Sequence, residues 1–216
     1  MAFSSTSIKN TDLFQIQDSN SSAVYYGCDQ TWYRTKWQRL AGCGPTTAAN
    51  LFYYHVRSGA AAEGEIIPAK SRCVALMEET WNFVTPGLRG VNTTAMFSGG
   101  ISAFASAKAM RAEPMALDIP KNRFQRPELS AVSEFLENSL SKDLPVAFLN
   151  LDNGDEKRLD SWHWVTVIAL DYERDGAAAV KILDEGRIKQ IDLALWLQTT
   201  SLGGGFVSVT WFDSVL

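Results

Sequence analysis

The residues with the clearest capacity for chemistry lie in the segment QRLAGCGPTTAANLFYY, residues 38–54. Cys43 stands between two glycines, and Pro45 after it suits the first turn of a helix. Unpaired backbone N–H groups and the helix dipole at that end favour the thiolate, which is the reactive form of cysteine. The segment therefore predicts a nucleophile, although a buried structural cysteine at a tight turn fits the turn chemistry equally well.

A cysteine nucleophile needs a base within hydrogen-bond reach, and the chain has only two histidines. His55 lies twelve residues after Cys43 on the same predicted helix, a distance of roughly 18 Å that excludes contact. His163 begins the apolar stretch HWVTVIALDY. A lone histidine in a strand is more often a packing residue than a base, but no other histidine can serve Cys43.

A carboxylate is expected beside His163. The pair Asp175-Gly176 predicts a hairpin turn, and a hairpin centred near residue 174 pairs residue 163 with about residue 185. Asp184 and Glu185 then lie at the same end of the hairpin as the histidine, and the register does not choose between them. Either carboxylate could hold the imidazole in one tautomer and stabilise its charged form.

The surrounding elements divide into helices first and strands later. Apolar spacing predicts helices over 46–57, 70–84, 99–111 and 128–141, and β-branched and aromatic runs predict strands over 145–151, 163–172, 179–184, 187–193 and 206–212. Residues 1–35 are expected to be mainly loops. This order predicts one α+β domain, with a helical part over 36–143 and an antiparallel sheet over 144–216.

Composition narrows the classes of function. The net charge of −4 offers no reason to expect nucleic acid or an anionic membrane as a partner. No signal peptide or membrane span is visible, which favours a cytoplasmic protein. Cys28, Cys43 and Cys73 form neither a disulfide framework nor a metal-ligand pattern, so no metal or cofactor is expected. Cys73 lies on the apolar face of its predicted helix and is expected in the core.

The segment WQRLAGCGPTTAANL resembles the nucleophile segment of papain-like cysteine peptidases. It is most similar to the bacterial branch that includes the double-glycine, bacteriocin-processing peptidases and their stand-alone relatives. That branch has a Gln, a Cys-Gly-Pro that opens a central helix, a histidine strand and an Asp after the next strand. The matching residues are Gln38, Cys43, His163 and Asp184.

Two departures from the family pattern leave alternatives open. Gln38 lies five residues before the cysteine, whereas the family's glutamine usually lies about six before it, and Gln30 is the alternative if its loop folds back. Asp184, Glu185 and Gly186 replace the family's Asp-Pro-Trp, so the orienting carboxylate is open as well.

The resemblance implies a papain-like fold and a Cys-His-Asp triad that acts on a peptide or protein substrate. Cys43 would attack a carbonyl, His163 would move the proton, and the Gln38 amide with the Cys43 N–H would hold the oxyanion. A peptidase or amide hydrolase is expected first, and an acyl- or amide-transferring enzyme or an inactive binding module are the alternatives. The aromatic stretches 32–37 and 162–164 either line a substrate cleft or belong to the core.

Overall fold

The computed structural model describes residues 5–19, 21–60, 67–172 and 178–213. Its α-helices are α1 (Lys36–Ala41), α2 (Cys43–Ala60), α3 (Lys70–Trp81), α4 (Thr94–Ala107), α5 (Leu129–Leu140) and α6 (Leu193–Thr199). Its strands are β1 (Ser5–Ser7), β2 (Gln15–Gln17), β3 (Val24–Tyr26), β4 (Met110–Ile119), β5 (Val146–Asn150), β6 (His163–Tyr172), β7 (Ala178–Asp184), β8 (Arg187–Asp192) and β9 (Gly204–Asp213). Short 3-10 helices are η1 (Thr11–Phe14), η2 (Gln30–Trp32) and η3 (Arg123–Gln125).

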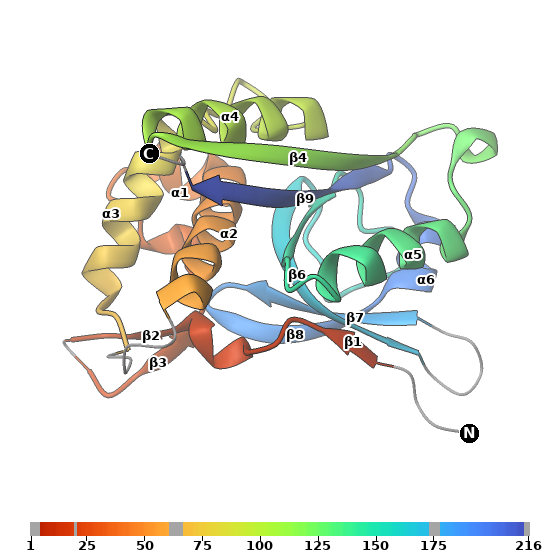
Figure 1. Cartoon of the computed structure of the whole chain (residues 1–216). Coiled ribbons are helices and arrows are strands. Elements are labelled where there is room, and N and C mark those ends of the chain that lie inside the picture. The colour runs from red at the N-terminus through yellow and green to blue at the C-terminus, as the bar shows by residue number, and fades with distance from the viewer. Residues whose placement is uncertain (1–4, 20, 61–66, 173–177, 214–216) are drawn as a thin grey trace.

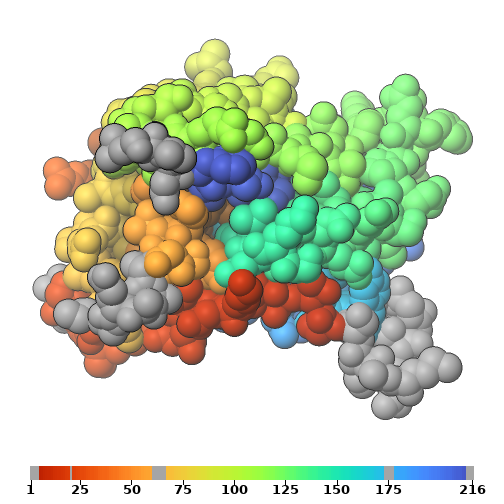
Figure 2. Space-filling model, in the orientation of Figure 1, coloured from red at the N-terminus to blue at the C-terminus, as the bar shows by residue number. Residues whose placement is uncertain are grey.

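One antiparallel sheet connects most of the described strands. Its order is β4-β9-β5-β6-β7-β8, and β1 pairs with the far half of β6. Figure 1 shows α1, α2 and α3 gathered at one side of this sheet, α5 and α6 at the other, and α4 lying along β4. Figure 2 shows the surface where α5 lies against β1. The predicted α+β class, with an antiparallel sheet packed against helices, is confirmed.

The centre of the sheet is buried on both faces, and β5 shows how. All five of its residues are buried, and successive side chains of a strand point to opposite faces. Val146 and Phe148 belong to one hydrophobic cluster. Ala147 and Leu149 belong to a second cluster that also contains Cys43. The thiol therefore lies at the border of a packed core between α2 and the sheet.

The four predicted helices and five predicted strands are present, with shifted ends, but β4 was missed. The helix expected over 99–111 is α4, Thr94–Ala107, and Met110–Ile119 then forms a ten-residue strand. Pro114 argues against a strand, because proline cannot donate to a ladder. β4 tolerates it because β4 is an edge strand that pairs only with β9. The sheet therefore draws a strand from the part expected to be helical.

The β6–β7 hairpin brings the predicted base and carboxylate together. Thr166 pairs with Leu183 and Val167 with Ile182, and an irregularity then shifts the register by one residue. The predicted turn at Asp175-Gly176 lies outside the described residues. His163 and Asp184 nevertheless meet at the predicted end of the hairpin.

Candidate active site

The break between α1 and α2 fixes the position of Cys43. Thr35 and Gln38 form a capping box at the start of α1, Gly42 ends that helix, and Cys43 is the first residue of α2. A Cβ on Gly42 would lie 2.5 Å from a ring carbon of Tyr33, and one on Gly44 would lie 2.9 Å from Val91. Both glycines are therefore required for close packing around the thiol.

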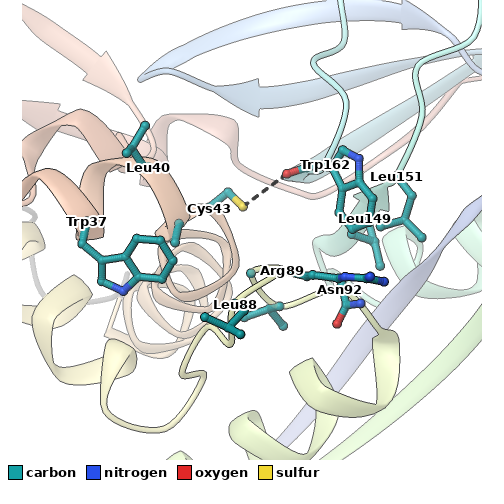
Figure 3. Close-up of a pocket in the computed structure, with 12 residues that line it drawn as sticks. Trp37, Leu40, Cys43, Leu88, Arg89, Asn92, Leu149, Leu151 and Trp162 are labelled. Atoms are coloured by element: carbon teal, nitrogen blue, oxygen red, sulfur yellow. Dashed lines mark hydrogen bonds between the residues drawn. The ribbon is translucent and has the colours of Figure 1, made fainter.

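Cys43 is mostly buried but still reachable. The residue is 8% exposed, and its side chain lines two pockets, one on each side of the sulfur. Its Sγ lies 4.0 Å from the carbonyl oxygen of Trp162, the residue before His163 (Figure 3). Trp162 has a left-handed backbone with φ of 58°, a conformation that costs a bulky residue about 1–3 kcal/mol.

His163 is held between Cys43 and Asp184. Its Nε2 lies 2.7 Å from Oδ1 of Asp184, which leaves Nδ1 as the ring nitrogen that can serve the thiol. Burial opposes the charged imidazolium, but hydrogen bonds to Asp184 and to the Cys43 thiol, together with their charges, raise the pKa of His163 to about 10. The imidazole is therefore held as a cation at neutral pH.

Asp184, rather than Glu185, orients the histidine. Burial opposes the charge of Asp184, but the bonds to His163 and to Lys189 hold the pKa of its carboxyl below the ordinary value. Nζ of Lys189 lies 2.7 Å from Oδ2 of Asp184 and 2.9 Å from Glu185. Glu185 and Gly186 both have positive φ, 52° and 69°, as a type I′ turn requires. That turn directs Glu185 to Lys189.

The structure does not bring Gln38 to the thiol. The Gln38 side chain caps α1 by accepting from Thr35, and its Nε2 donates to Glu78. It lines a separate pocket that Cys43 does not reach. The capping sequence places Gln38 three residues after Thr35, where its amide is already engaged. The Gln38 side chain is therefore bonded to Thr35 and Glu78 in a pocket that Cys43 does not line.

Gln30, the alternative to Gln38, lies in a pocket beside the thiol. The loop before α1 folds back, and Gln30 lines the same small pocket as Cys43, His163 and Asp184. Nε2 of Gln30 donates to the carbonyl oxygen of Arg39 at 3.0 Å, which leaves the second amide hydrogen for another acceptor. Of the two candidate glutamines, Gln30 is thus the one that shares a pocket with the thiol.

Asn50 ties together the elements that carry these groups. It lies on α2, two turns after Cys43, and is 2% exposed. Its Oδ1 accepts from the N–H of Cys28 at 2.8 Å, and its Nδ2 donates to Oγ1 of Thr166 at 3.1 Å. One buried side chain therefore joins α2, the Gln30 loop and β6.

An apolar cleft opens on the other side of the sulfur. It has a volume of about 590 Å³. We call it the apolar cleft. Its walls are formed mainly by Trp37, Leu40, Leu88, Leu149, Leu151 and Trp162. Figure 3 shows Trp37 and Leu40 on the α1 side and Leu149 and Leu151 across from them. The aromatic stretch 162–164 contributes to both the cleft and the core: Trp162 lines the cleft, and Trp164 is buried.

Cys28 lines the small pocket beside Cys43, whereas Cys73 and His55 line neither pocket around the thiol. Cys73 is buried in the core, as its helical position predicted, and Cys28 is buried beside it. A hydrogen bond with Cys73 raises the pKa of the Cys28 thiol, and the same bond lowers the pKa of Cys73. His55 stacks on Trp211 at 5.6 Å between ring centroids. No role in the Cys43 site follows for these residues.

Lys189 and Asn50 were not found from the sequence. Asn50 leaves a weak signal, because it is a polar residue on the same face of the helix as Cys43. Lys189 lies two residues beyond a turn whose type only the structure reveals. The role of Asn50 depends on contacts between segments that are far apart in the chain.

Neither a protein-family model nor a curated protein matches the chain. Over the ranges that the structure describes, no helix has the length and apolarity needed to cross a bilayer. In the same ranges, no group of three or more His, Cys, Asp or Glu side chains is arranged to hold a metal ion.

Proposed function

We propose that this protein is a cysteine-type amide hydrolase, a peptidase or a close chemical relative, with a papain-like arrangement of helix and sheet. The observation that carries the proposal is that Cys43, His163 and Asp184 line one small pocket, in which the Asp184 carboxylate bonds the imidazole. A thiol at the start of a helix, an imidazole and a buried carboxylate in that order form the arrangement that activates a nucleophile. The central α2 helix against an antiparallel sheet supports the papain-like assignment.

The first chemical step is thiolate attack on a carbonyl carbon. The charged His163 stabilises the Cys43 thiolate before attack, and then gives its Nδ1 proton to the leaving amine. An acyl-enzyme on Cys43 results. His163, now neutral, takes a proton from the water that attacks the acyl-enzyme, and the C–S bond breaks to release the Cys43 thiolate beside the recharged imidazolium. Asp184 keeps the ring in the orientation that both transfers need.

Two donors are placed to hold the oxyanion. Cys43 is the first residue of α2, and the first N–H groups of a helix have no partner within that helix. Gln30 supplies the second donor from the small pocket through its free amide hydrogen. We therefore assign to Gln30 the role that the sequence resemblance gave to Gln38.

A thiol-directed activity probe tests the proposal. A peptidyl acyloxymethyl ketone should label the wild-type protein at a single site, and the Cys43→Ala variant should lose that labelling. Cys28→Ala and Cys73→Ala serve as matched controls and should keep it. A library of fluorogenic peptide amides then identifies turnover. Labelling that persists in Cys43→Ala, or the absence of turnover with every amide, would contradict the proposal.

A further inference from the structure

The apolar cleft has one polar wall, and that wall is cationic. Apart from the thiol and the two indole N–H groups, the side chains of Arg89 and Asn92 are its polar members. Among the described residues that line the cleft, none is Asp or Glu. The cleft therefore combines bulky apolar walls with one positive charge and no counter-charge.

A tight turn carries that charge into the cleft. Gly87 and Gly90 exchange both backbone hydrogen bonds, at 3.1 and 3.0 Å, so Leu88 and Arg89 form the tip of a two-residue turn. Trp164 anchors the base of the turn by donating its indole N–H to the carbonyl oxygen of Val91. The position of Arg89 is thus coupled to the strand that begins with His163.

Arg89 is also uncompensated. Arg89 is exposed, and within the described part of the chain no hydrogen bond or ion pair holds its guanidinium. Its neighbour Leu88 is fully exposed, and Trp37, Leu40 and Trp162 are 49%, 67% and 49% exposed. Large apolar side chains from separate segments thus stay exposed beside an unpaired cation, in the cleft that Cys43 also lines. Exposed apolar surface of this kind marks a binding site.

We propose that the substrate carries a bulky apolar residue close to the reacting carbonyl and a carboxylate next to that residue. The apolar residue fills the apolar cleft, and the carboxylate pairs with Arg89. This proposal rests on the proposed function, because it takes Cys43 as the point of attack. Continuity with the thiol argues for a substrate rather than a structural partner, since Cys43 itself lines the cleft.

Binding separates this inference from catalysis. The Cys43→Ala variant is titrated by calorimetry with the amides of acetyl-Glu-Leu-Ala, acetyl-Gln-Leu-Ala and acetyl-Glu-Ser-Ala. The Glu peptide should bind about fivefold tighter than the Gln peptide, as expected for a partly exposed charge pair. The Ser peptide should bind about tenfold more weakly than the Leu peptide, because it loses apolar burial.

The charge is then removed from the protein. Arg89→Met in the Cys43→Ala background should abolish the preference for Glu over Gln, and Arg89→Glu should reverse it. Arg123→Met is the matched control, since it removes an exposed arginine on η3 that lines none of the pockets around Cys43. Equal affinity for the Glu and Gln peptides, or a preference that survives Arg89→Met, would overturn the inference.

Turnover of the matching coumarylamides by the wild-type protein gives the second measurement. If the binding preferences hold and no amide is hydrolysed, the substrate inference stands and the proposed hydrolase function fails. If amides are hydrolysed without any preference for Glu at this position, the hydrolase function stands and the inference fails.

Discussion

The two pockets that Cys43 lines differ in the kind of side chain that surrounds them. On one side Gln30, His163 and Asp184 surround a pocket of about 210 Å³ with hydrogen-bonding groups. On the other side indole and leucine side chains line a cleft of about 590 Å³. The polar side can move protons and the apolar side can bind a large group. Substitutions on the polar side should therefore lower kcat, and substitutions on the apolar side should raise KM.

The largest effect is expected from His163→Gln. Loss of the proton-transfer group should lower kcat by about 1,000-fold and leave KM nearly unchanged. Rates of peptide amide hydrolysis measure both constants. His55→Gln is the matched control, because its ring stacks on Trp211, away from the thiol. A His163→Gln variant that keeps most of its kcat would break the assignment of proton chemistry to the polar side.

Asp184→Asn should lower kcat by about 100-fold and move the pKa of His163 from about 10 down toward its ordinary value of 6.5. Because the folded pKa is the higher one, protonation of His163 stabilises the fold fully below about pH 6.5, and that contribution is lost as the pH rises toward 10. Proton NMR can follow the shift, since the chain has only two histidines.

The pH dependence of unfolding tests the same pair. The wild-type protein should lose stability between about pH 6.5 and 10, and the Asp184→Asn variant should lose less over that interval. Urea unfolding at several pH values measures the difference. A variant with an unchanged His163 titration would show that Asp184 does not hold the charge of the ring.

On the apolar side, Leu88→Ser should raise KM by about tenfold for substrates with a leucine next to the reacting residue and leave kcat unchanged. Leu88 is fully exposed, so its removal should not affect folding. Phe124→Ser offers the matched control, because Phe124 is 99% exposed and lies on η3. A change in kcat as large as the change in KM would contradict the assignment of substrate binding to the apolar side.

The smallest effect is expected from Lys189→Met. Lys189 lowers the pKa of Asp184 by a bond and by its charge, so its loss should raise that pKa. The acid side of the activity profile should then move to higher pH, with only a few-fold loss of kcat near pH 7. Lys181→Met removes a lysine that pairs with Asp171 instead, and should leave the profile in place.

Four helices, five strands, Cys43 and His163 could be predicted from local cues in the sequence, whereas the choice of Asp184 over Glu185 came from the family resemblance. Pro45 after Cys43 indicates a helix start, and two apolar strands around a turn bring His163 and Asp184 to one end. The glutamine that donates to the oxyanion could not be identified, because the choice between Gln30 and Gln38 depends on how the loop before α1 folds. The capping box at Thr35 was the available signal, since it already engages Gln38.

The cleft could not be predicted for a different reason. Trp37, Leu88 and Trp162 come from three separate segments, and nothing in the sequence of any one segment indicates that the three meet. β4 likewise could not be predicted, because a strand tolerates Pro114 only when it lies at the edge of the sheet. Edge position and cleft walls are properties of the assembled fold rather than of local pattern.

The residues at the end of β5 separate substrate preference from the support of the catalytic groups. Leu149 and Leu151 line the apolar cleft, while Asn150 between them is fully buried. Asn150 donates to the carbonyl oxygen of Asp160 and accepts from Trp196, both at 2.7 Å, which holds the loop that leads to His163. Selection could therefore exchange the leucines to suit a new substrate while the anchor between them preserves the machinery.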